Sequence, residues 1–178
     1  MVKLNNKKIR KLLNYHESSP NKTKQGGQLE DLVCYIFENI HGVSLMARDA
    51  YDNSTDQEID LIFWNEQTQN GLHFLPPIIA FECKNWYTRS VNGRELSWFA
   101  SKLRNKGLNL GIVVSRSGIT GNKSRGTDGY GELQNILHDG CKILEISLHD
   151  LEKITDTNQV VAMLREKLRN LVIPLNVR

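Results

Sequence analysis

Hydrophobic positions recur along the 178-residue chain with the periods of helices and strands, in an order typical of a layered α/β domain. The segment "GGQLEDLVCYIFENIHG" (26–42) has the clearest helical pattern, because its apolar residues recur at i, i+3, i+4, i+7 and i+8. Gly42 can end this helix. We also predict an amphipathic helix over 93–107 and a basic helix over 2–16.

Strand-like segments lie between and after these helices. They cover residues 43–50, 58–64, 75–84, 108–115 and 141–147. A glycine-rich loop, a short helix near 131–138 and two closing helices complete the pattern. The order of helix, three strands, helix and strand predicts a mixed α/β layered domain. We expect a single domain, with a basic N-terminal helix (1–25), a core (26–122) and an added C-terminal strand and helices (123–178).

The strand within "PPIIAFECKNW" combines an apolar run with two charges. Strand side chains alternate, so Glu82 and Lys84 share a face with Ile78 and Ala80. Charges in a buried run need partners, because removing them from water is costly. Two interpretations remain at this point: the strand emerges into solvent after Phe81, or its end carries a functional site.

Two further acids lie on elements that we expect to be neighbours of this strand, namely the strand over 58–64 and the helix over 26–42. Asp60 leads into the apolar run of "DQEIDLIFW", although Asp56 and Glu58 share its face, so alternation alone does not decide which acid acts. Glu30 borders the buried stripe of the first amphipathic helix, whereas Asp31 points away from it. Three carboxylates and one ammonium thus come from three elements.

This set of groups suits metal-dependent cleavage of phosphodiesters. Mg²⁺ prefers carboxylate oxygens and water, and a substrate phosphate completes its coordination. The metal lowers the pKa of a bound water, while a nearby lysine orients or deprotonates that water and stabilises the charge at phosphorus.

The spacing of Asp60, Glu82 and Lys84, with Glu30 on a preceding helix, resembles the PD-(D/E)xK nuclease superfamily. The segments "GGQLEDLVCYIF", "EIDLIFW", "ECKNW", "VNGRELSWFASKL" and "LGIVVSRSGITG" resemble, in order, the Mrr-like restriction endonuclease catalytic domain over about residues 26–122. Many Mrr-like proteins have Gln at the position of Glu82, so the match is to the broader ExK form.

The resemblance implies a restriction-endonuclease-like αβββαβ core, with a mixed sheet flanked by helices. It also implies a DNA endonuclease of the restriction or defence type that depends on Mg²⁺ or Mn²⁺. By position, Asp60, Glu82 and Lys84 match the catalytic set, with Asp60, Glu82 and Glu30 as metal ligands. A homodimer is a reasonable expectation, since cutting two antiparallel strands suits a twofold axis.

Two alternatives stay open. One is a structure-specific nuclease like the Holliday junction resolvases of the same superfamily. The other is a non-catalytic nucleic-acid-binding protein on a nuclease scaffold.

The net charge of +3 conceals a strong asymmetry along the chain. Residues 1–24 have a balance of +6, residues 30–82 of −9, residues 84–125 of +8 and residues 126–178 of −2. An acidic block between two basic ones suits a protein that gathers metal ions in the middle and a polyanion around them. The candidate DNA contacts in the basic blocks are Lys22, Lys24, Arg89, Arg94, Arg104, Arg116, Lys123 and Arg125.

Composition adds a cellular expectation. Cys34, Cys83 and Cys141 are odd in number and lie in apolar segments, which favours reduced thiols in a cytoplasmic protein. No apolar run approaches the ~20 residues of a membrane span.

Overall fold

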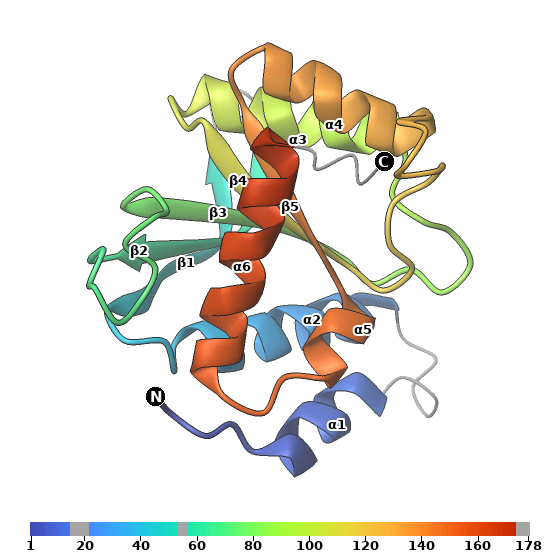
Figure 1. Ribbon diagram of the computed structural model, residues 1–178. Coiled ribbons are helices and arrows are strands. Elements are labelled where there is room, and N and C mark those ends of the chain that lie inside the picture. The colour runs from blue at the N-terminus through green and yellow to red at the C-terminus, as the bar shows by residue number, and fades with distance from the viewer. Residues whose placement is uncertain (15–21, 53–56, 174–178) are drawn as a thin grey trace.

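The computed structural model describes residues 1–14, 22–52 and 57–173. In this part of the chain, one five-stranded sheet has the order β1-β2-β3-β4-β5 (Figure 1). The strands are β1 (Val43–Asp52), β2 (Gln57–Asn65), β3 (Ile78–Lys84), β4 (Leu110–Ser115) and β5 (Lys142–Ser147). The pairs β1–β2 and β2–β3 are antiparallel, whereas β3–β4 and β4–β5 are parallel. The predicted mixed α/β fold, with its helix, three strands, helix and strand in this order, is therefore confirmed.

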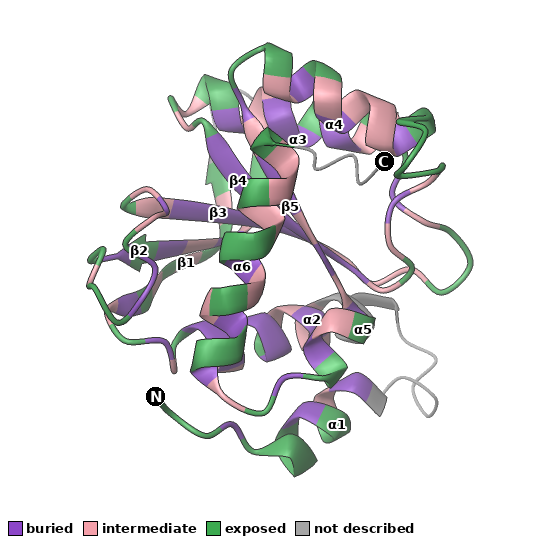
Figure 2. Cartoon of the chain, in the orientation of Figure 1, coloured by how far each residue is buried: buried purple, intermediate pink, exposed green. Residues whose placement is uncertain are grey.

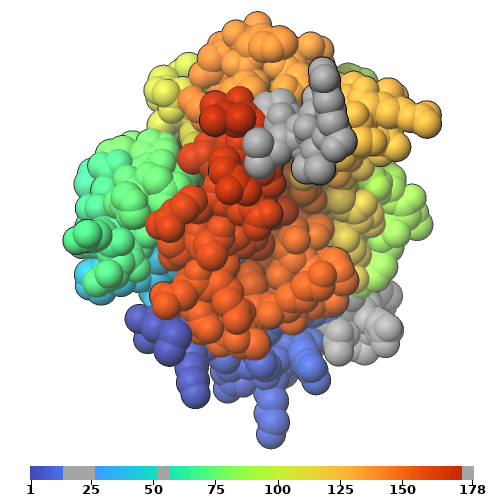
Figure 3. All heavy atoms as spheres, viewed as in Figure 1, coloured from blue at the N-terminus to red at the C-terminus, as the bar shows by residue number. Residues whose placement is uncertain are grey.

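Helices cover both faces of this sheet. They are α1 (Asn6–Asn14), α2 (Lys22–Phe37), α3 (Gly93–Asn105), α4 (Asp128–His138), α5 (Leu148–Glu152) and α6 (Thr157–Val172). In Figure 1, α3 and α4 lie above the sheet, and α2, α5 and α1 lie below it. Helix α6 contacts β5. The space-filling view shows α6 at the surface of the molecule that faces the viewer (Figure 3).

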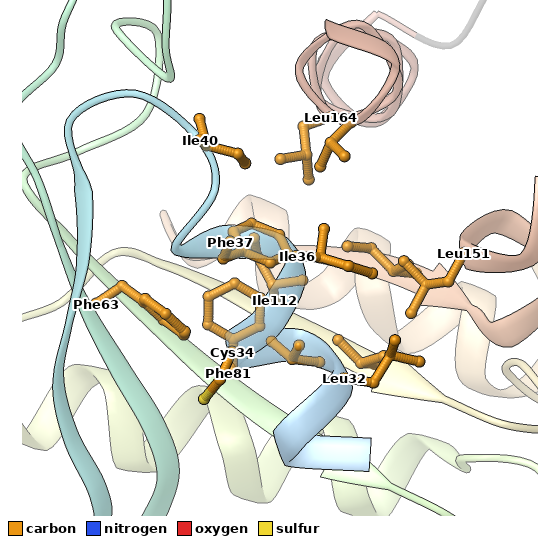
Figure 4. Close-up of a cluster of buried hydrophobic side chains, with 14 of the residues drawn as sticks. Leu32, Cys34, Ile36, Phe37, Ile40, Phe63, Phe81, Ile112, Leu151 and Leu164 are labelled. Atoms are coloured by element: carbon orange, nitrogen blue, oxygen red, sulfur yellow. The ribbon is translucent and has the colours of Figure 1, made fainter. Parts of the chain in front are cut away.

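Two hydrophobic clusters hold these layers together. The larger one joins α2 to the lower face of the sheet, and its centre is a set of aromatic rings (Figure 4). The centroid of the Phe37 ring lies 4.7 Å from that of Phe81, and Phe81 lies 5.2 Å from Phe63. The smaller cluster joins α3 and α4 to the upper face through Phe99, Val113 and their neighbours. Figure 2 shows β3 and β4 as continuously buried stretches, whereas β1 is largely exposed.

Element boundaries depart from the prediction at several places, and α1 begins at Asn6 rather than at residue 2. Helix α2 spans 22–37 instead of 26–42, because residues 38–42 form turns that lead to Gly42 at φ +76°. Strand β3 begins at Ile78 rather than at 75, since two prolines without N–H groups precede it. Strand β1 continues to Asp52, two residues beyond the expected end.

The position of α3 follows from its start and from one glycine of β4. Asn92 and Glu95 form a capping box that fixes the first turn. A Cβ atom added to Gly111 would lie 2.7 Å from side-chain atoms of Phe99 and Leu103, so only glycine permits this close approach of helix and strand. Gly111 pairs with Ala80 within β3, and Ala80 packs in the same cluster as the buried residues of α3.

The three cysteines are free thiols, and Cys34 and Cys141 are buried. Among the described helices, none has the length and apolar character needed to cross a membrane.

Candidate active site

Strands β2 and β3 diverge at one end of their ladder, and we call this opening the fork. The ladder between these strands ends with the pair Leu61 and Phe81. Beyond that pair, β2 continues alongside β1 as far as Gln57, while β3 continues alongside β4 as far as Lys84. The predicted acids Asp60 and Glu82 are the first residues beyond the last pair, so the fork begins with them.

Asp60 bridges the fork through its carboxylate. Its Oδ2 atom accepts a hydrogen bond of 2.6 Å from the backbone N–H of Cys83, the residue between Glu82 and Lys84. Burial and the negative charge of Glu82 raise the pKa of Asp60 to about 6, although the Cys83 N–H and the lysines nearby act in the opposite direction. The backbone of β3 therefore fixes Asp60 close to Glu82.

Glu82 is the most enclosed of these acids and is held by two lysines. Its side chain is 7% exposed, and Lys84 Nζ lies 2.6 Å from its Oε1 atom. Lys102 Nζ, from α3, lies 2.9 Å from Oε2 and 3.1 Å from Oε1. Burial lowers the pKa of Lys84, but the charge of the Glu82 carboxylate and its hydrogen bond to Lys84 raise the pKa by more. The net pKa is above the usual value, so Lys84 is an ammonium.

Glu30 approaches the fork from α2. Burial, followed by the negative charges of Asp60 and Asp49, raises the pKa of Glu30 to about 7. Asp49 lies on β1 between residues paired with Ile59 and Leu61, which places it across from Asp60, and it has φ +48°. Asp31, the next residue after Glu30, is exposed and bonds Arg48 at 2.6 Å, as its position on the helix predicts.

One comparison with known proteins identifies the family. A model of the Mrr_cat family, described as restriction endonuclease, matches residues 22–146, well over half of the chain. The chain belongs to this family. A search of curated proteins gives no match.

The restriction endonuclease match includes every residue of the fork. It also runs past residue 122 to the end of β5, which pairs with β4 in the same sheet. A restriction endonuclease domain implies a nuclease that acts on DNA. The predicted fold and the predicted PD-(D/E)xK ancestry are thus both confirmed.

The structure brings together Glu30, Asp60, Glu82 and Lys84, as the electrostatic coupling of Glu30 to Asp60 and the contacts above show. These acids are not arranged as a complete metal-binding site. Among the described residues, no group of three or more His, Cys, Asp or Glu side chains is arranged to hold a metal ion. Asp56, the alternative acid of β2, lies outside the described residues.

Sequence reasoning missed Lys102 and Asp49. Lys102 follows Phe99 by three positions and directly precedes Leu103, both of which are buried, so it borders the apolar stripe of α3 as Glu30 borders that of α2. The same helical periodicity would have found it. Asp49 gave no comparable signal, because a single acid in a half-exposed strand is common.

The predicted DNA contacts differ in how they are placed. Arg94, Lys123 and Arg125 are exposed. Arg89 is exposed too, with its guanidinium 3.6 Å from the ring centroid of Trp86. Arg104 is exposed and lies 3.9 Å from Asp139.

Arg116 has structural partners. Its Nε donates to Asn85 at 3.0 Å and its Nη2 to the carbonyl of Leu13 at 3.2 Å, which joins β4 to the end of α1. Lys22 and Lys24 lie in the first turn of α2, but their side chains fall outside the described residues.

The raised pKa of Glu30 predicts how stability depends on pH in the metal-free protein. Between the ordinary value of 4.5 and about 7, the folded state binds more protons than the unfolded state, so stability should fall as pH rises through this window. Glu30→Gln should remove that loss. We expect a gain of about 1 kcal/mol over the parent at pH 8, after allowance for partial exposure, and none near pH 4.

Urea denaturation in EDTA across this pH range checks the prediction. Glu38→Gln, which alters an exposed carboxylate just beyond the end of α2, serves as the control and should give no gain over the parent that grows with pH. An equal gain from Glu30→Gln at pH 4 and pH 8 would contradict it.

Proposed function

We propose that the chain is a divalent-metal-dependent endonuclease that hydrolyses DNA phosphodiester bonds, with a role in restriction or defence. The observation that carries the proposal is the fork, where Asp60, Glu82 and Lys84 meet at the diverging ends of two strands and Glu30 approaches from α2. Acids whose pKa values are raised by burial and by a neighbouring charge, as at Asp60 and Glu30, are common at functional sites.

The donor atoms at the fork fit a hard cation. Asp60, Glu82 and Glu30 offer carboxylate oxygens only, the ligands that Mg²⁺ and Mn²⁺ accept. Burial, and after it the neighbouring negative charges, raise the pKa values of Asp60 and Glu30, and a divalent cation would stabilise their charged forms. Asp60 and Glu82 would hold the ion directly, and Glu30 would act on its water shell.

The remaining groups have separate roles in hydrolysis. A bound divalent ion would supply an activated water and offset charge on the attacking and leaving oxygens. Attack of that water on phosphorus breaks one phosphorus–oxygen ester bond and leaves a phosphate monoester and a free hydroxyl. Lys84 would donate its N–H bonds to the phosphoryl oxygen that gains charge, since it is an ammonium beside Glu82.

One experiment tests the proposal directly. Supercoiled and linear plasmid, methylated and unmethylated, is incubated with the protein and Mg²⁺, Mn²⁺ or EDTA. We expect nicked or linear products with metal and none with EDTA. Binding without cleavage under every condition would favour the non-catalytic alternative. Cleavage restricted to added flaps or four-way junctions would favour a structure-specific nuclease.

DNA affinity should fall steeply as salt rises. The exposed basic side chains of residues 84–125, together with the basic block 1–24, would bind backbone phosphates and release counterions. Fluorescence anisotropy with a labelled duplex, in EDTA between about 50 and 200 mM salt, measures the slope. Paired replacement of Lys123 and Arg125 by Gln should reduce that slope by about two. Affinity indifferent to salt would contradict phosphate-led binding.

A further inference from the structure

Glu82, which the proposed function assigns to a metal, has both of its carboxylate oxygens engaged. Oε1 accepts from Lys84 at 2.6 Å and from Lys102 at 3.1 Å, and Oε2 accepts from Lys102 at 2.9 Å. Of these two lysines, Lys84 reaches one oxygen and Lys102 reaches both. Its side chain is 13% exposed, so this ion pair is enclosed together with Glu82. These three N–H bonds leave about one of the four acceptor positions of the carboxylate for a cation, and that position lies beside two ammonium groups.

At the centre of the fork, two carboxylates meet two ammonium groups without a metal, and the acids Glu30 and Asp49 lie around them. Asp60 and Glu82 contribute two carboxylates, and Lys84 and Lys102 contribute two ammonium groups. A divalent ion at Glu82 would add its positive charge beside the ammonium groups of Lys84 and Lys102, and their repulsion is unfavourable at low dielectric. Two changes relieve that charge: Lys102 leaves Glu82, or a DNA phosphate enters beside the metal.

We propose that Lys102 is a positioning residue that holds Glu82 in the metal-free protein and competes with the divalent ion for it. Metal binding is therefore weak in the free protein and strengthens when DNA is bound, because the phosphates supply the negative charge that admits the ion. By linkage, the metal strengthens DNA binding by the same factor. This inference rests on the proposed function in one respect, the assignment of Glu82 as a metal ligand.

The packing of α3 supports a fixed position for this lysine. Phe99 and Leu103 flank Lys102 in sequence and would both meet a Cβ atom on Gly111, so the helix lies directly on the strand. Lys102 thus reaches Glu82 from a rigid element, whereas Lys84 reaches it from the end of the same strand. Release of Glu82 requires a rotamer change of Lys102, and no movement of the helix.

The chain contains a matched control in a second enclosed lysine. Lys167 of α6 lies 3.7 Å from Glu145 Oε2 and 2.9 Å from Asp150 Oδ2, with a side-chain exposure of 19%. This group joins α6 to β5 and α5, and β4 separates it from the strand that carries Glu82. Removal of Lys167 reports what the loss of an enclosed lysine does to the fold alone.

Calorimetric titration with Mn²⁺ compares the parent, Lys102→Met, Lys102→Gln, Lys167→Met and Asp60→Asn. Each is titrated alone and with a short phosphorothioate duplex that resists cleavage. We expect both Lys102 variants to bind Mn²⁺ at least about 10-fold more tightly than the parent without DNA, because a competing charge is gone. Lys167→Met should match the parent. The duplex should strengthen Mn²⁺ binding of the parent more than that of the Lys102 variants.

The outcomes separate this inference from the proposed function. Lys102→Gln keeps a hydrogen-bond donor for Glu82, so it carries the test where Lys102→Met does not fold. Unchanged or weaker Mn²⁺ binding in Lys102→Gln, with binding lost in Asp60→Asn, would overturn the role of Lys102 and leave the metal site standing. Mn²⁺ binding absent from the parent and from both Lys102 variants, with and without DNA, would overturn both.

Discussion

Replacing Asp60 by Asn should abolish metal-dependent DNA cleavage, with a loss of at least about 10³-fold in rate. Asp60 faces Glu82 across the fork, and its carboxylate is the acid that the backbone of β3 fixes in place. Asn keeps an oxygen that can accept the Cys83 N–H, but it loses the negative charge that a divalent ion needs. Plasmid cleavage in Mg²⁺ and in Mn²⁺, measured as initial rates, checks this expectation.

Two controls distinguish loss of a ligand from loss of the fold. Asp31→Asn removes an exposed acid whose partner is Arg48, and it should leave cleavage unchanged. Without metal, Asp60→Asn should be at least as stable as the parent at pH 8, since burial and Glu82 disfavour the Asp60 charge. A loss of several kcal/mol in EDTA would instead indicate a structural network, and would remove the catalytic assignment.

The fold could be predicted from the sequence because apolar residues recur with different periods in the helices and in the strands. The i, i+3, i+4 pattern around Leu32 and Ile36 belongs to a helix that covers one sheet face, and the continuous apolar run of β4 belongs to a strand covered on both sides. Boundaries were less accessible, because they depend on tertiary contacts. Asn65 illustrates this: its buried amide donates to the carbonyls of Leu72, Leu75 and Pro76 and so organises the loop before β3.

The candidate site was partly accessible for the same reason. Glu82 and Lys84 interrupt a buried run, and that conflict between charge and burial is visible in one strand. The partner that occupies Glu82 is not visible there, because Lys102 lies 20 positions away and depends on the approach of α3 at Gly111. Sequence order predicts which elements are neighbours, but the contact between two long side chains depends on packing distance.

The two lysines at Glu82 should respond differently to substitution, and this difference assigns their roles. Lys84→Gln should lower the cleavage rate by at least about 10²-fold, by analogy with the loss of one preorganised donor to the transition state. Mn²⁺ affinity should stay the same or increase slightly, because a positive charge beside Glu82 is removed. Single-turnover cleavage with saturating Mn²⁺ separates the rate from the affinity.

Lys84 lies on the strand that carries Glu82, so its position relative to the fork is fixed by the backbone of β3. Lys102 lies on a helix and engages both oxygens of a proposed metal ligand, so its loss should change metal affinity first. A rate for Lys84→Gln within tenfold of the parent at saturating Mn²⁺ would contradict the assignment. If Lys102→Gln instead showed the large loss of cleavage rate, Lys102 would be the donor to the phosphoryl oxygen. It is the other ammonium that contacts Glu82 among the described residues.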